Sequence, residues 1–209
     1  LSISSSIMQL LRTDVYSGNF PALYNQVSAS IGEMKASSPF IDNIVLCSAR
    51  NKIVIQTNGT TSYWLYHKNR FQSSYQDWET FLMNADRKLN LNTIPLREPL
   101  PDAISASSLI GTISVYVGRH YLGTILIELD LQAINRMILV STTQSGSCIT
   151  LMNAKYEPVA GNHDIDTILS VSQLSTIDIA PAASGNFEDE TSIYSYRKSL
   201  SGNYCILVK

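Results

Sequence analysis

Charge is scarce in this sequence, which has 15% charged residues, a net charge of −2 and no run of Lys or Arg. Proteins that bind nucleic acid through its phosphates need a basic surface that displaces counterions. We therefore expect no nucleic-acid partner. Long apolar runs are also missing, since there is no stretch of about 18 apolar residues and no signal-peptide pattern. These absences fit either a cytosolic protein or an extracellular domain separated from its membrane segments.

The motifs of common enzyme classes are missing as well. His67, His120 and His163 are scattered, and the sequence contains no HExxH, GxSxG, GxGxxG or P-loop pattern. The stretch Asn162-His163-Asp164-Ile165-Asp166 resembles a set of metal ligands. However, it stands where a helix is expected to begin, and Asp is favoured there as a cap. The sequence therefore favours a protein that is not an enzyme, with no metal and no cofactor.

Cysteine is also scarce, with three residues in the sequence. Cys47, Cys148 and Cys205 are an odd number of thiols in apolar surroundings, and no CxxC pair is present. Free, buried thiols are the expected state. One disulfide between two of them is the alternative that the sequence leaves open.

Apolar residues make up 44% of the 209 residues, which is enough for one large domain or two small ones. Helical spacing predicts two helices in the first 36 residues, with a break at Ser17-Gly18-Asn19 and with Pro21 in the first turn of the second. The first helix carries the apolar stripe Ile3, Ile7, Leu10 and Leu11. This stripe either packs on the chain's own sheet or forms a homodimer interface.

Strand patterns appear in two sets. Residues 41–57 and 111–129 each read as two strands joined by a turn, and the second pair leads directly into a helix from Leu131 to about Thr142. A shorter set follows, with a hairpin at 145–161, a helix near 164–174 and two closing strands within 192–209 that are joined by a turn at 201–203. The sequence therefore predicts an α+β fold with a loosely duplicated module.

The segment from Asn58 to Asp102 is rich in aromatic residues and irregular, apart from a helix expected near Trp78 to Leu89. Long insertions of this kind in a compact domain usually serve function. Aromatic rings with a few polar groups are what a small-molecule pocket needs. A surface that binds another protein through outward-pointing rings is the alternative.

The order of these elements resembles that of a known family. The stretches "SPFIDNIVLCSARNKIVIQT", "DWETFLMNA", "YLGTILIELDLQAINRMI" and "LSGNYCILVK" together are similar to the double Cache extracytoplasmic sensor domain of bacterial receptors. The first stretch is most similar to the Gram-positive branch, in which such domains precede a sensor histidine kinase or an AraC-type regulator.

The resemblance implies a long N-terminal helix followed by two PAS-like antiparallel-sheet modules. It divides the chain into a helical stalk (1–37), a membrane-distal module (38–130), a connecting helix (131–145) and a smaller membrane-proximal module (146–209). It further implies an extracellular location, membrane attachment through flanking segments, and a small-molecule ligand in the distal module. Binding there would shift the population of states of the sheet that ends at Asp130.

Amino-acid-binding members of the family carry a compact Arg-x-Trp-Tyr arrangement, which this sequence lacks, so amino-acid specificity is not carried over. Arg70 lies eight positions before Trp78, and Tyr75 precedes the Trp. On physical grounds, Arg70 suits a carboxylate or phosphate, and aromatic residues supply flat walls with polar tips. The expected ligand-binding residues are Tyr63, Tyr66, Arg70, Trp78 and Tyr116. The competing interpretations are core packing for Trp78 and Tyr116, and a solvated loop cation for Arg70.

Overall fold

The computed structural model describes residues 5–85, 87, 89–97, 107–142, 147–153, 158–161, 184–188, 193–198 and 204–209. The chain divides into two compact units. The first consists of Leu1–Asn90 and Ile94–Asp130, and the second of Leu91–Thr93 and Leu131–Lys209. The predicted α+β class with two antiparallel sheets is confirmed.

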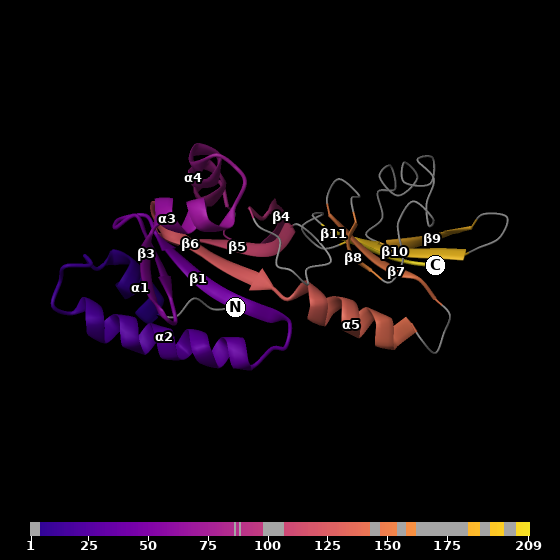
Figure 1. Ribbon diagram of the computed structural model, residues 1–209, viewed down its shortest axis with the longest axis horizontal. Coiled ribbons are helices and arrows are strands. Elements are labelled where there is room, and N and C mark those ends of the chain that lie inside the picture. The colour runs from indigo at the N-terminus through magenta and orange to yellow at the C-terminus, as the bar shows by residue number, and fades with distance from the viewer. Residues whose placement is uncertain are drawn as a thin grey trace. The chain divides into compact units, whose positions relative to one another are not determined.

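A six-stranded sheet with the strand order β3-β2-β1-β6-β5-β4 forms the centre of the first unit (Figure 1). Its strands are β1 (Ile41–Ser48), β2 (Ile53–Gln56), β3 (Gly59–Ser62), β4 (Asn90–Pro95), β5 (Ser107–Val117) and β6 (His120–Leu129). The two predicted hairpins, β1–β2 and β5–β6, are antiparallel pairs. The two hairpins join through β1 and β6, so β6 lies in the middle of the sheet.

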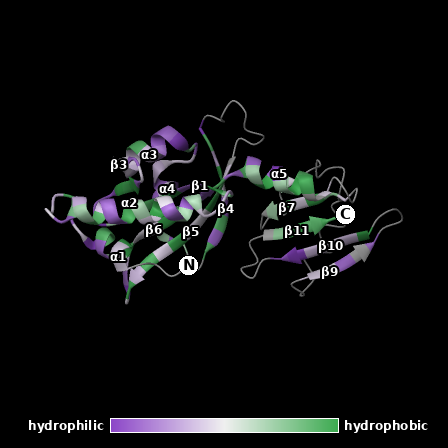
Figure 2. Ribbon diagram, turned by 90° about the horizontal axis from the view of Figure 1, so that it is seen from below, coloured by the Kyte–Doolittle hydropathy of each residue, from purple (hydrophilic) through white to green (hydrophobic). Residues whose placement is uncertain are grey.

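Two helices cover one face of this sheet (Figure 1). They are α1 (Ser5–Arg12) and α2 (Phe20–Ala36), and Pro21 lies in the first turn of α2 as predicted. The N-terminal segment is therefore two helices with a break at residues 13–19, not one long helix. In Figure 2, α2 carries both apolar and polar segments, as expected for a helix that lies on a sheet.

The predicted apolar stripe of α1 is buried within its own chain. Ile7 is 4% exposed, and Leu10 and Leu11 are fully buried against aliphatic side chains of the sheet. This decides between the two alternatives for these three residues, because side chains in the core are not available to a second copy. Ile3 lies outside the described residues.

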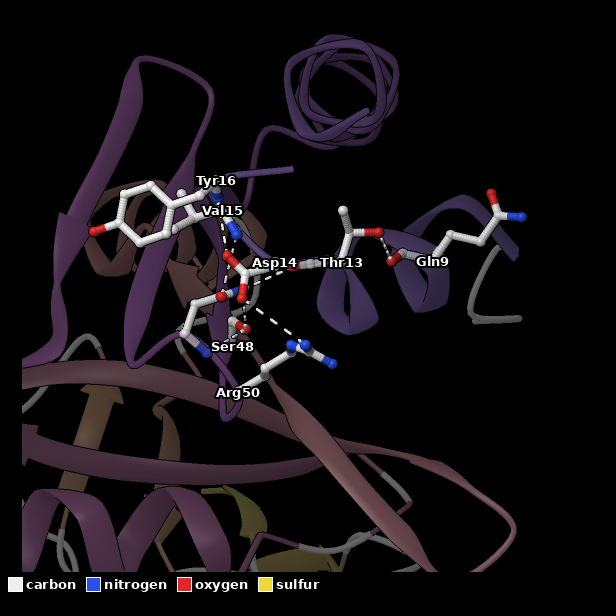
Figure 3. A network of polar contacts seen from close by, with 8 residues as sticks. Gln9, Thr13, Asp14, Val15, Tyr16, Ser48 and Arg50 are labelled. Carbon is white, nitrogen blue, oxygen red and sulfur yellow. Dashed lines mark hydrogen bonds and ion pairs between the residues drawn. The ribbon is translucent and has the colours of Figure 1, made fainter. Parts of the chain in front are cut away.

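A polar contact fixes the end of α1 to the β1–β2 turn (Figure 3). The Asn51 side chain donates a hydrogen bond to the Thr13 carbonyl (2.9 Å) and accepts one from the Val15 backbone N–H (3.2 Å). Arg50 and Asp14 add an exposed ion pair at 3.8 Å. One amide thus satisfies both a donor and an acceptor of the chain that leaves the helix.

Two further helices cover the opposite face of the first sheet (Figure 1). They are α3 (Tyr63–Arg70), which the sequence did not predict, and α4 (Tyr75–Met83), which begins and ends earlier than the helix predicted near Trp78 to Leu89. Each begins at a serine, Ser62 or Ser74, whose hydroxyl accepts a backbone N–H from the first turn.

The second unit contains α5 (Leu131–Thr142) and a five-stranded sheet with the order β8-β7-β11-β10-β9. The strands are β7 (Ile149–Asn153), β8 (Pro158–Gly161), β9 (Ser184–Glu188), β10 (Ile193–Lys198) and β11 (Tyr204–Val208). α5 and the hairpin β7–β8 match the prediction, whereas β9 was not predicted. The predicted helix at 164–174, the turn at 201–203 and the cluster Asn162–Asp166 lie outside the described residues.

The three cysteines are free thiols, and Cys47 and Cys205 are buried. This agrees with the expected state and not with the disulfide alternative. Among the described residues, no helix is both long and apolar enough to cross a membrane.

Candidate ligand-binding site

The two faces of the first sheet differ in polarity. Side chains alternate between the faces along each strand. The face beneath α1 and α2 is aliphatic, with Ile44, Leu46, Ile113, Val115, Ile125 and Ile127 in its core. The buried polar side chains of β5 and β6 alternate along the strands with these aliphatic residues and lie on the other face, together with Ile110 and Leu126. They are Thr112, Ser114, Thr124 and Glu128. We call this face, beneath α3 and α4, the polar face.

Glu128 is the buried charge of the polar face. Its side chain is 1% exposed. The carboxylate accepts a hydrogen bond from Tyr66 Oη at 2.6 Å and forms an ion pair with Arg70 Nη2. Tyr66 and Arg70 are four residues apart on α3, so they lie on the same side of that helix. Burial, followed by the negative charge of Glu128, raises the pKa of Tyr66 well above its usual value. Tyr66 therefore remains a hydrogen-bond donor to Glu128.

Tyr66 also belongs to an aromatic cluster, defined here as Tyr66, His67, Phe71, Trp78 and Phe81. Trp78 is 1% exposed and stacks on Phe71 with ring centroids 4.7 Å apart. Its ring also lies 6.1 Å from Tyr66 and 6.1 Å from His67. Burial lowers the pKa of His67, so its imidazole is held in the neutral form. Tyr66 thus links the Glu128 carboxylate to a buried group of rings.

Hydrogen bonds attach α4 to the same strand that carries Glu128. The Leu82 carbonyl accepts from Thr124 Oγ1 at 2.7 Å and from Tyr121 Oη at 3.2 Å, and both donors belong to β6. Burial raises the pKa of Tyr121 to about 12. Because α3 is held through Glu128 and α4 through Thr124, β6 anchors both covering helices.

Lys52 and Glu79 join α4 to the β1–β2 turn. Lys52 Nζ lies 3.0 Å from Glu79 Oε1, and Tyr75 Oη donates to the same oxygen at 3.1 Å. The hydrogen bond from Lys52 lowers the pKa of Glu79. Lys52 also lies over the Tyr63 ring, 5.6 Å from its centroid. These contacts hold Tyr63 and α4 together at the end of the site nearest the turn.

Several buried polar atoms of this region have no hydrogen-bond partner within the described part of the chain. They are Tyr63 Oη, Arg70 Nε, Trp78 Nε1 and Ser114 Oγ. Leaving a buried donor or acceptor unpaired costs about 1–3 kcal/mol, so native proteins rarely keep several in one place without a purpose. Unpaired atoms gathered on one face are groups that a buried water or a ligand can satisfy.

The structure brings together four of the five predicted site residues. Tyr63, Tyr66 and Trp78 belong to one buried cluster, and Arg70 joins it through Glu128. Tyr116 does not join them: its ring lies 5.5 Å from Tyr121 and beneath Arg87, 4.5 Å from that guanidinium carbon. Arg70 is not a solvated loop cation, because it ends α3 and pairs with Glu128.

Glu128 is the site residue that the sequence analysis missed. It is the single acidic residue in β6, HYLGTILIEL, among aliphatic neighbours. A charged residue at an inward-facing position of an apolar strand is rare unless it is paired, and this was the available signal. Its partners lie 58 and 62 residues away in sequence, so spacing alone did not reveal them.

No protein-family model matches the chain, and no curated protein matches it in sequence. Solved structures with the same fold do match. The sensory domain of the Campylobacter jejuni chemoreceptor Tlp3 with isoleucine bound is 9% identical, with a TM-score of 0.52 over 98% of this chain and 80% of that one. The fold is that of bacterial sensory domains.

Extracellular domains of two proteins assigned as histidine kinases share it as well. That of rpHK1S-Z16 is 9% identical, with a TM-score of 0.56 over 97% of this chain and 80% of that one. That of vpHK1S-Z8 is 13% identical, with a TM-score of 0.53 over 98% of this chain and 78% of that one. These similarities cover both units of the chain and concern the fold alone.

Proposed function

We propose that this chain is the extracellular ligand-sensing domain of a bacterial transmembrane receptor, and that it binds a small molecule at the polar face of the first sheet, beneath α3 and α4. The observation that carries the proposal is the set of buried polar atoms without partners at Tyr63, Arg70, Trp78 and Ser114, beside the buried Glu128. Unpaired buried polar atoms lower stability, so a core built only for stability would keep few of them in one place.

The aromatic residues favour a ligand site over a protein-binding surface. Tyr63, Tyr66, Phe71 and Trp78 are all 7% exposed or less, whereas Trp64 is 54% exposed. A module that binds another protein through this segment would display these rings on its surface. The sensory fold supports the same choice, since the similar domains belong to receptors and kinases.

Signal transfer in this proposal uses β6. The strand holds α3 through Glu128 and α4 through Thr124, and three residues after Glu128 the chain reaches Leu131, where α5 begins. A ligand that binds one arrangement of α3 and α4 more tightly than another shifts the population of states of β6. The receptor, attached to the membrane by flanking segments, then reports to a kinase or to an AraC-type regulator.

A thermal-shift screen of the purified chain against amino acids, sugars, small carboxylates, purines and polyamines tests the proposal. A ligand at about 100 times its dissociation constant stabilises the fold by about 2.7 kcal/mol. A stabilising compound whose effect is lost in Ser114→Ala supports the polar face as the site. Ser114 has no partner within the described chain, so this variant should fold as well as the parent.

The matched control compares the two tryptophans. Trp64 is 54% exposed and Trp78 is 1% exposed, so Trp64→Ala should keep the ligand response and Trp78→Ala should lose it. Retention of the response in both Ser114→Ala and Trp78→Ala would place the ligand elsewhere and refute the proposed site.

A further inference from the structure

The chemistry of the unpaired atoms restricts the ligand class, an argument that rests on the proposed function. Arg70 Nε and Trp78 Nε1 are donors that cannot accept a hydrogen bond. Both belong to one neighbourhood: the Trp78 ring lies 6.1 Å from that of Tyr66, and Tyr66 and Arg70 share the Glu128 carboxylate. A ligand that satisfies them must present acceptor atoms.

Two acceptors of this neighbourhood, the Glu128 carboxylate and the Leu82 carbonyl, already receive two hydrogen bonds each. One oxygen of Glu128 accepts from Tyr66 and the other from Arg70. The Leu82 carbonyl accepts from both Thr124 and Tyr121. A ligand ammonium brings three donors and no acceptor. Because Glu128 is already paired with Arg70, an ammonium beside it would gain little charge compensation, and it would offer no acceptor to Arg70 Nε or Trp78 Nε1.

Charge around the end of α3 favours an anion. Arg70 and Glu128 cancel, and the backbone N–H of Arg97 donates to the Arg70 carbonyl at 2.9 Å. The positive charge of Arg97 is one cause, after burial, of the lowered pKa of His67, so its field reaches the aromatic cluster. The field of this single Arg suits a monoanion better than a phosphate monoester, which carries about −1.5 to −2.

We infer that the ligand is a small organic monocarboxylate without an ammonium group, its oxygens accepting from Arg70 Nε and Trp78 Nε1 and its apolar body lying against the aromatic cluster. Ser114 Oγ and Tyr63 Oη can donate or accept, so they suit a further hydroxyl or carbonyl on the same molecule.

Matched sets of three probes test this inference by calorimetry on the whole chain. Each set holds a carboxylic acid, the amino acid with the same skeleton and the amide of that amino acid. The sets are propionate, alanine and alaninamide; 4-methylpentanoate, leucine and leucinamide; and 3-phenylpropionate, phenylalanine and phenylalaninamide. We expect at least one acid to bind at least tenfold more tightly than its amino acid, and the amides not to bind.

Two conservative variants separate the donors from the bulk of the side chains. Trp78→Phe keeps an aromatic ring and removes the indole N–H, and Arg70→Lys keeps the charge and removes Nε. Each should weaken acid binding about tenfold or more, the loss expected for one charge-assisted contact. Trp64→Phe, on the exposed side of α3, is the matched control and should bind as the parent does.

The outcomes distinguish this inference from the proposed function. If an amino acid or an amide binds as tightly as its acid and Trp78→Phe weakens that binding, the site stands and the ligand class is wrong. If no acid binds at millimolar concentration, the class is wrong as well. The proposed function then depends on the broader thermal-shift screen, and it fails if that screen is also empty.

Discussion

Arg70 and Glu128 form an ion pair between a partly exposed cation and a buried anion, with side-chain exposures of 35% and 1%. Arg70 therefore stands between Glu128 and solvent. Removing one partner of such a pair leaves the other charge buried without compensation, which costs more than the pair itself contributes.

We accordingly expect Arg70→Ala to destabilise the first unit by about 3 kcal/mol, at the low end for buried pairs because Arg70 is partly exposed. Urea unfolding measures the loss. Arg50→Ala is the matched control: its pair with Asp14 is 3.8 Å long and exposed on both sides, so it should cost less than about 1 kcal/mol. Equal effects of the two substitutions would contradict the buried role of Glu128.

Asn51 holds the end of α1 to the β1–β2 turn, and its loss should loosen that attachment. Asn51→Ala removes one donor and one acceptor to backbone groups of Thr13 and Val15, and should cost about 1–3 kcal/mol. Asn51→Asp keeps the acceptor for Val15 and loses the donor to Thr13. Chemical denaturation should therefore rank the two variants with Asp between Ala and the parent.

Gly123 lies in the central strand β6 with φ +155°, a backbone conformation that glycine alone adopts easily. A Cβ there would come within 2.0 Å of the Cys47 carbonyl oxygen of the neighbouring strand. Gly123→Ala should destabilise by several kcal/mol or abolish folding, because backbone must move. Gly18→Ala, with no atom within 4 Å of the added Cβ, should fold normally, as soluble yield and circular dichroism would show.

His67 should make stability depend on pH near neutrality. Burial lowers its folded-state pKa below the unfolded value of about 6.5, so below that pH the unfolded chain binds more protons. The stability that the folded chain gains from the neutral His67 imidazole is therefore fully present above about pH 6.5 and is lost as pH falls through the folded-state pKa. Between pH 7.5 and 5.5, His67→Gln should lose less stability than the parent does.

Two other titratable residues, His120 and Glu79, bear on this pH experiment. His120→Gln, at an exposed position where β6 begins, should keep the parent's difference between the two pH values. Glu79, whose pKa is lowered by Lys52, acts below its ordinary value of 4.5, outside this window. An unchanged slope in His67→Gln would contradict burial of the neutral imidazole.

The sequence predicted the elements whose apolar residues follow a regular period. The hairpins at 41–57 and 111–129 alternate or run apolar, and the helix from Leu131 follows its strand with one residue between them. α3 escaped prediction because YWLYHKNR is built largely of aromatic, His and Asn residues with weak helix propensity. Ser62 caps it, and burial of Tyr63, Tyr66 and His67 supplies what propensity does not.

The candidate site was predicted as a set of aromatic residues and one arginine, without the acid that organises them. Tyr116 is an aromatic residue like the members of the cluster. However, it follows the register shift in the β5–β6 pairing between Val115 and Tyr116, and its ring packs next to Tyr121. Pairing across many residues decides which aromatic side chains meet, and a local pattern contains no such information.

The anchoring of both covering helices to one strand has a kinetic consequence. The bonds from β6 to α3 and α4 join residues 39 to 62 positions apart in the chain. Such contacts form only after β6 has paired in its correct register, since a slip by one residue would turn Thr124 and Glu128 to the other face. We expect α3 and α4 to be the last elements of the first unit to acquire amide-exchange protection and the first to lose it. Their transient opening would then be the route by which a molecule reaches Glu128 without unfolding the sheet beneath.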